Sequence, residues 1–128
     1  MTTELTLLLY SVVLMFAIIL APAVLAIIEN GVLTQAGPRD NLPEPSVLLA
    51  RLRRLAANMQ ENLVMFAAIV LIAHSAGVSD SNTVLGAQLF FYGRLAHALI
   101  YAAGVPLIRP LAWSVSAVGM VMIALALV

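Results

Sequence analysis

The sequence contains no cysteine and no lysine, and it has few charged residues of any kind. Without cysteine, the chain can form no disulfide, no thiolate metal site and no cysteine nucleophile, so any thiol chemistry must come from a ligand. Charged residues make up 9% of the chain, with six basic and six acidic residues. No basic surface therefore indicates nucleic acid as a partner.

Hydrophobic residues are what the chain has in excess. They make up 63% of its 128 residues, and the mean hydropathy is +1.08, which is typical of an integral membrane protein. A membrane span needs about 20 apolar residues, and four such segments occupy nearly the whole sequence. We therefore expect an all-α, integral membrane four-helix bundle that forms one domain over residues 1–128. The expected helices cover about residues 5–28, 46–76, 83–103 and 110–128.

The boundaries of these segments follow from turn residues and caps. The first segment contains APAVLA, which resembles the end of a secretory signal, but its apolar run is too long and no positive charge precedes it. We expect a transmembrane helix that bends near Pro22. A long polar connection follows, and Ser46 is the expected N-cap of the second helix.

The arginines predict the orientation in the membrane. Arg39, Arg51, Arg53 and Arg54 lie in or just after the first connection, and Arg109 lies in the third. Arginine-bearing connections face the cytoplasm in most membrane proteins. We therefore expect both termini on the opposite side and the first turns of the second helix to extend into the cytosol.

Polar residues form two stripes on the second and third helices. Their spacing by three and four residues places each set on one helix face. Counted from the short second connection at about 1.5 Å per residue, Glu61 lies level with His97, and Asn58 lies level with Tyr101. The members are Arg51, Arg54, Asn58 and Glu61 on the second helix, and Arg94, His97 and Tyr101 on the third.

Each of these residues also has a purely structural interpretation. Glu61 and Arg94 would form a neutralising pair that fixes helix register. His97 alone is typical of a satisfied interior residue, and Tyr101 and Trp113 are typical of the lipid interface. The arginines, Arg109 included, would serve only as topology signals, and His74 is expected to be structural.

The combination favours a ligand site over these separate roles. So many polar groups are costly within a membrane unless they line a polar cavity. Guanidinium groups suit carboxylates, Glu61 suits an ammonium group and Asn58 suits an amide. A zwitterionic peptide has all of these groups.

Two segments resemble one known family. RLRRLAANMQE resembles the Arg-x-x-Arg-Ala-x-x-Asn-x-x-Glu signature of the MAPEG family, the membrane-associated proteins in eicosanoid and glutathione metabolism. GRLAHALIYAAGVPLIRP is similar to the third-helix segment of its prostaglandin E synthase and microsomal glutathione transferase branch. The resemblance implies a homotrimer that binds glutathione between subunits near the cytoplasmic side. It also implies a lipophilic second substrate that enters from membrane lipid.

The resemblance assigns residues position by position. It implies glutathione contacts at Arg51, Arg54, Asn58, Glu61, Arg94, His97 and Tyr101, and it places Arg109 near the glutathione sulfur as the catalytic residue. The sequence differs at two positions, where Pro110 replaces a serine of prostaglandin E synthase and Trp113 replaces a tyrosine. These differences argue against prostaglandin synthesis itself.

The expected activity is a glutathione-dependent membrane transferase or peroxidase acting on a lipophilic electrophile or a lipid hydroperoxide. The alternative is a non-catalytic lipid-binding scaffold of the same fold, which the fold alone does not distinguish. A small multidrug or proton-coupled transporter ranks last, because the first helix has no acidic residue between Glu4 and Glu29.

Overall fold

The computed structural model describes all residues, 1–128, and is entirely helical apart from its connections. The four long helices that the sequence predicts are confirmed, with ends shifted by a few residues. A short additional helix, α2, lies within the long polar first connection. The helices are α1 (Thr3–Asn30), α2 (Val32–Ala36), α3 (Val47–Ser75), α4 (Ser81–Ala103) and α5 (Arg109–Ala126).

Local sequence explains where the long helices begin and end. Ser46 caps α3 as predicted, since its side chain accepts a hydrogen bond from the Leu49 amide. Asp80 and Thr83 form a reciprocal capping box at the start of α4. Gly104 ends α4 in the left-handed conformation, with φ of 75°. Helix α1 continues without interruption through Pro22.

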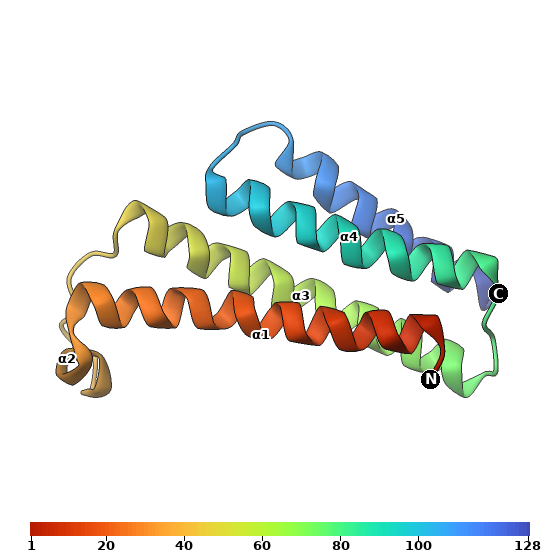
Figure 1. The fold of residues 1–128 in the computed structure, drawn as a ribbon, viewed down its shortest axis with the longest axis horizontal. Coiled ribbons are helices and arrows are strands. Elements are labelled where there is room, and N and C mark those ends of the chain that lie inside the picture. Colours follow the sequence, from red (N-terminus) through yellow and green to blue (C-terminus); the bar gives the residue numbers. More distant parts are fainter.

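The helices form two pairs (Figure 1). Helix α1 lies alongside α3, and α4 lies alongside α5. The first connection and the α4–α5 turn, which carry the exposed arginines, lie at one end of the bundle. Both termini and the α3–α4 turn lie at the other end. This arrangement is the one that alternate crossings of a membrane require.

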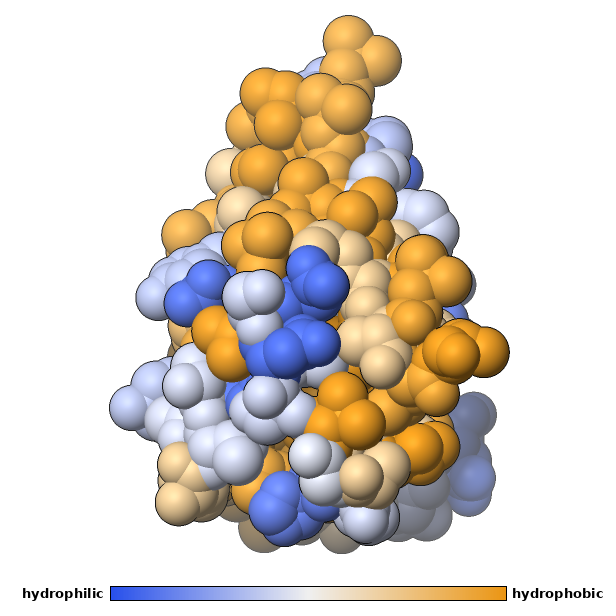
Figure 2. Space-filling view, turned by 90° about the vertical axis from the view of Figure 1, so that its right-hand side faces the viewer, coloured by the Kyte–Doolittle hydropathy of each residue, from blue (hydrophilic) through white to orange (hydrophobic).

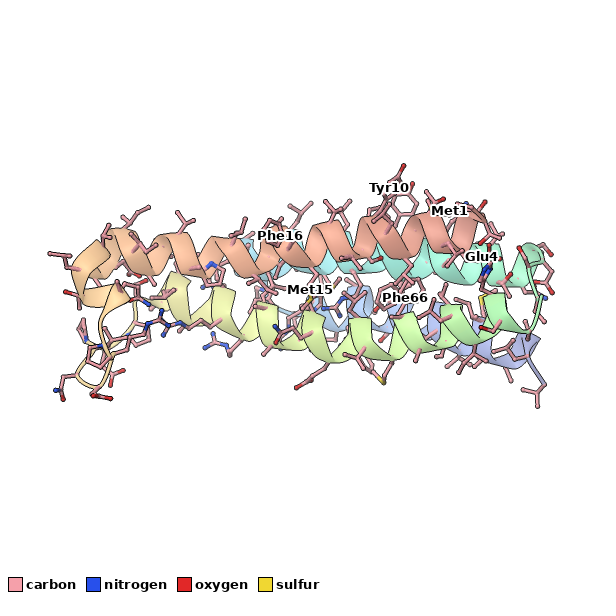
Figure 3. The ribbon with its side chains drawn as sticks, turned by 90° about the horizontal axis from the view of Figure 1, so that it is seen from below. Met1, Glu4, Tyr10, Met15, Phe16 and Phe66 are labelled. Atoms are coloured by element: carbon pink, nitrogen blue, oxygen red, sulfur yellow. The ribbon has the colours of Figure 1, made fainter.

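Three of the four long helices, α1, α3 and α5, are long and apolar enough to cross a membrane. We expected four such helices, but α4 carries too many polar side chains along its length to meet the same standard. Figure 2 views the bundle from the end that carries the termini, where apolar side chains lie beside a polar region. Large apolar side chains are also exposed along α1, α3 and α5, as expected for a protein whose surroundings are lipid. Tyr10 and Phe16 point outward from α1 in Figure 3 and are 51% and 63% exposed.

The core joins the two helix pairs through aromatic packing. Phe66 of α3 and Phe90 of α4 are fully buried, and their rings stack with centroids 3.8 Å apart. Figure 3 shows Met15 and Phe66 between α1 and α3. Apolar side chains are as favourable in contact with lipid as they are in the protein interior. Close packing and hydrogen bonds must therefore hold the helix pairs together.

Glycine allows α4 and α5 to approach closely. A Cβ atom added at Gly119 would lie 2.3 Å from the Gly86 carbonyl oxygen, and one added at Gly86 would lie 2.6 Å from the Gly119 carbonyl oxygen. About two turns further along α4, a Cβ atom added at Gly93 would lie 2.9 Å from the Ser116 amide nitrogen. Backbone contact of this kind through small residues is the principal packing mode of membrane helices.

Glu4 ties α1 to α4 at the end of the bundle that carries the termini. Its side chain is 4% exposed and accepts hydrogen bonds from the Ser79 and Thr83 hydroxyls. The α3–α4 turn and the first turn of α4 are thus both held against the start of α1. A buried carboxylate is stable only with such donors, so this contact fixes how the two helix pairs align.

We expect Gly119→Ala to destabilise the bundle, because the new methyl group would collide with the backbone of α4. Overpacking of this kind costs about 1–3 kcal/mol. Thermal unfolding in mild detergent, followed by the fluorescence of Trp113, measures the loss. Gly37→Ala is the matched control, since its added Cβ would meet nothing closer than 3.5 Å and should leave the melting temperature unchanged. Equal stability of both variants would contradict the close contact.

Candidate functional site

The buried centre of the site is Arg94, which is 1% exposed within the bundle. Its Nη2 donates a hydrogen bond of 2.7 Å to Asn58 Oδ1, and its Nε donates to Met59 Sδ at 3.4 Å. Its Nη1 is buried and has no hydrogen-bond partner in the chain. The guanidinium therefore connects α4 to α3 while part of its hydrogen-bonding capacity is unused.

Asn62 fixes the α3 side of this contact. It is 3% exposed, and its Nδ2 donates 2.8 Å to the Asn58 carbonyl, one turn earlier on α3. Its own Oδ1 is buried without a partner. Sequence analysis did not single out Asn62, although a polar residue within an apolar run was a signal for it. No sequence pattern marks Met59 as an arginine partner.

A second contact between the stripes lies nearer the end of the bundle. Arg54 Nε donates a hydrogen bond of 3.1 Å to the Tyr101 hydroxyl. The guanidinium carbon of Arg109 lies 5.0 Å from the centre of the Tyr101 ring, within the range of a cation–π contact. The His97 ring lies 5.6 Å from the Tyr101 ring, and His97 Nδ1 is buried without a partner. Tyr101 thus contacts residues from α3, α4 and α5.

Arg51 closes this end of the site. Its Nη1 donates 3.3 Å to the Ala102 carbonyl near the end of α4, where such carbonyls lack helical partners. A Cβ atom added at Gly104 would lie 2.8 Å from the Arg51 guanidinium, so glycine is needed there for space as well as for its φ of 75°.

The turn that carries Arg109 is held in an unusual conformation. Leu107, which precedes α5 by two residues, has φ of 71°, a left-handed value that is rare for a bulky side chain. Its side chain is 86% exposed. Backbone strain of this kind costs about 1–3 kcal/mol and occurs often near binding sites.

Two adjoining cavities of about 400 Å³ each lie among these residues, and the second includes Asn58 and His97 among its walls. Both are open to the surface, and both lie at the end of the bundle that carries the α4–α5 turn (Figure 1). Four residues line both cavities, namely Arg54, Tyr101, Arg109 and Pro110.

The structure brings together six of the eight predicted site residues directly, and it changes the expected layers. Asn58 pairs with Arg94 instead of lying level with Tyr101, which pairs with Arg54. Long arginine side chains can reach partners that do not lie level with their own backbone.

Two predicted members stand apart from these contacts. Arg51 lines the first cavity but touches only the end of α4. Glu61 is exposed on the outer surface of the single chain, and Arg94 is held by Asn58 and Met59 instead of by a carboxylate. The register-fixing Glu61–Arg94 pair is therefore absent within one chain.

Residues that we had assigned elsewhere also occupy the site. Trp113, expected at the lipid interface, lines the second cavity together with Pro110. Their spacing on α5 from Arg109 by one and four residues was the available signal, because it places them beside the predicted catalytic arginine. His74 lies at the opposite end of the bundle and lines a separate cavity with Glu4.

The arrangement has a clear chemical character. Arginines from α3 and α5 surround two cavities whose walls contain no carboxylate. A phenol and an imidazole add neutral groups able to donate or accept hydrogen bonds. A small polar ligand with negative charge suits this lining, and the guanidinium at the start of α5 would lie beside it.

The comparison with protein families agrees with the sequence motifs. The chain matches no curated protein and no solved structure. The model of the MAPEG family matches residues 6–128, which include all of the helices except the first residues of α1, and every residue of the site. A match over nearly the whole length shows common descent, and the chain therefore belongs to the MAPEG family.

Proposed function

We propose that the protein is a glutathione-dependent membrane transferase or peroxidase that acts on a lipophilic electrophile or a lipid hydroperoxide. The MAPEG family includes enzymes of both kinds, and its members typically use glutathione. The single observation that carries the proposal is the convergence of Arg54, Tyr101 and Arg109 on two shared cavities. Within the family, the motifs resemble the prostaglandin E synthase and microsomal glutathione transferase branch.

The residues fit glutathione. Ligand cavities typically measure about 300–1,000 Å³, and each cavity here measures about 400 Å³. A buried polar atom without a partner is costly, so His97 Nδ1, whose residue lines the second cavity, supports a polar ligand there. The carboxylates of a peptide suit the arginines, and its amides suit Asn58.

The arginines would have different roles in ligand binding. Arg51 and Arg54 are on the α3 wall and would hold carboxylates, while Arg94 orients Asn58 from behind through its 2.7 Å hydrogen bond. Tyr101 is held by Arg54 and would present its hydroxyl to the ligand. His97 packs against Tyr101 and would limit the movement of its ring.

Arg109 is the proposed catalytic residue. When bound, glutathione supplies a thiol that reacts as the thiolate, and a cysteine-type thiol has a pKa of about 8.5. A guanidinium beside the sulfur favours the thiolate. Arg109 is the first residue of α5, and its guanidinium lies beside both cavities. The exposed, lipid-contacting surface next to Trp113 would admit the second substrate.

We also propose that the site is completed by a second copy of the chain, in a homotrimer of the kind known in the family. Arg54 and Glu61 are exposed on one chain although both belong to the polar stripe of α3. Exposed ionisable groups are unfavourable next to lipid, so contact with a neighbouring subunit would protect them. The arginine-bearing end would face the cytoplasm, with both termini opposite.

The alternative is a non-catalytic member that binds lipid and presents it to a partner. Pro110, in place of a serine, and Trp113, in place of a tyrosine, favour this alternative because both line the proposed thiol site. Neither side chain can donate a hydrogen bond from a hydroxyl group. The two functions differ in whether Arg109 changes the reactivity of the bound thiol.

The first test measures glutathione binding and turnover in wild type and in Arg109→Ala. We expect turnover with a generic electrophile or a lipid hydroperoxide to fall by about 10²–10³, since the variant removes a charge that stabilises the reacting thiolate. The dissociation constant, measured by isothermal titration, should change much less, because the other arginines remain. The bound thiol's pKa, followed by thiolate absorbance, should rise toward its solution value.

Arg109→Lys is the matched control, because it retains the positive charge and should retain part of the activity. Wild type that binds glutathione without any turnover would favour the scaffold. Absence of glutathione binding by wild type would contradict both the enzyme and its assigned site.

The second test concerns Glu61. We expect its carboxylate to bind the ammonium group of a glutathione molecule that lies between its own subunit and a neighbouring one. Glu61→Gln keeps the shape and removes the charge. Glutathione affinity should fall by at least tenfold, whereas a desamino analogue, which lacks the ammonium group, should bind both proteins equally. Equal losses for the two ligands would show that Glu61 supports the fold instead of binding the ammonium group. Native mass spectrometry of the same samples reports whether the binding species is a trimer.

A further inference from the structure

A further cavity, separate from the candidate site, is lined by residues of α1, the first connection with α2, and the start of α3. Figure 1 shows these elements together at one end of the bundle. The cavity measures about 290 Å³ and shares no residue with the two cavities of the candidate site. Two arginines, Arg39 and Arg53, form its polar side together with Gln35. No acidic side chain lines it.

The apolar side of this cavity is a stripe on α1. Five α1 residues between Ile19 and Ile27 line it, spaced by three and four along the sequence, so they occupy one helix face over about two turns. Ile27 lies near the end of α1 and Ile19 lies deeper in the span. The cavity therefore combines a cationic end with an apolar strip that continues toward the middle of the membrane.

Arg39 is held in place by the backbone. Its φ is 66°, a left-handed value, and its Nε donates a hydrogen bond of 2.7 Å to the Gln35 carbonyl at the end of α2. This contact uses one of the five guanidinium donors and leaves the others for a ligand. Arg53 lies on the α3 face opposite to the polar stripe of the candidate site, and its side chain is exposed.

We propose that this cavity binds the headgroup of an anionic phospholipid, with an acyl chain along the Ile19–Ile27 face of α1. Basic pockets between membrane helices bind anionic headgroups, and a guanidinium matches phosphate oxygens in geometry as well as in charge. The volume suits a phosphate with its glycerol but not a whole lipid, so the chains must lie outside, along apolar surface. A lipid meets both requirements and a soluble phosphate meets only the first.

The occupancy of this cavity is independent of glutathione. Arg53 and Arg54 are neighbours in sequence but point to different cavities, since successive helical residues are turned by about 100°. One arginine therefore belongs to the lipid cavity and the next to the candidate site. This separation provides a matched pair of variants that remove the same charge one residue apart.

Native mass spectrometry of the full chain in mild detergent tests the proposal, with phosphatidylglycerol and phosphatidylcholine of identical chains as probes. Wild type should retain phosphatidylglycerol at least tenfold better. Arg39→Gln with Arg53→Gln should remove this preference, at about fivefold for each arginine. Arg54→Gln should keep the preference and lose glutathione affinity. Replacing Arg39 and Arg53 with lysine instead of glutamine should retain much of the preference for phosphatidylglycerol.

Three results would overturn the proposal. Equal retention of the two lipids by wild type would show no anionic site. A loss in Arg54→Gln as large as in the double variant would show general attraction instead of a cavity. Displacement of phosphatidylglycerol by glycerol 1-phosphate at equal concentration would show a phosphate site without a lipid requirement. The competition with glycerol phosphate uses wild type alone, so it stands even where a variant fails to fold.

Discussion

A guanidinium inside a membrane bundle must find hydrogen-bond acceptors, and Arg94 finds them only on α3. Its contacts with Asn58 and Met59 determine which face of α4 meets α3. Removing Arg94 from these acceptors would cost far more free energy than losing any single apolar contact. The reason is that lipid solvates apolar side chains as well as the protein interior does. The alignment of the two helix pairs depends on this requirement.

The candidate site follows from the same alignment. Two further hydrogen bonds lie along the same α3–α4 interface as the Arg94 contact, namely Arg54 to Tyr101 and Arg51 to Ala102. At the opposite end of the bundle, Glu4 of α1 holds the first turn of α4. The site therefore lies between the two helix pairs, where a small change in their separation alters every contact of Tyr101.

Much of the fold could be predicted from the sequence, because apolar runs and caps set the helices and their order. The polar stripes also anticipated which side chains of α3 and α4 would face one another, since helical periodicity alone places Arg54 and Asn58 on one face. Which residues pair across the stripes could not be predicted, because the register depends on the α3–α4 turn and on side-chain length. The positions of Met59 and Trp113 depend on packing between helices that periodicity does not describe.

The polarity of α4 has a consequence for how the chain enters the membrane. Helices α1, α3 and α5 are apolar enough to partition into lipid individually, whereas α4 carries Arg94 and His97 across the same distance. A charged residue at the centre of an isolated span opposes insertion by about 2.5–3.5 kcal/mol. The Gly86–Gly119 contact lets α5 shield one face of α4 as a hairpin. We therefore expect α4 to enter the bilayer more readily together with α5 than alone, and Asn58 of α3 to satisfy Arg94 once both are in place.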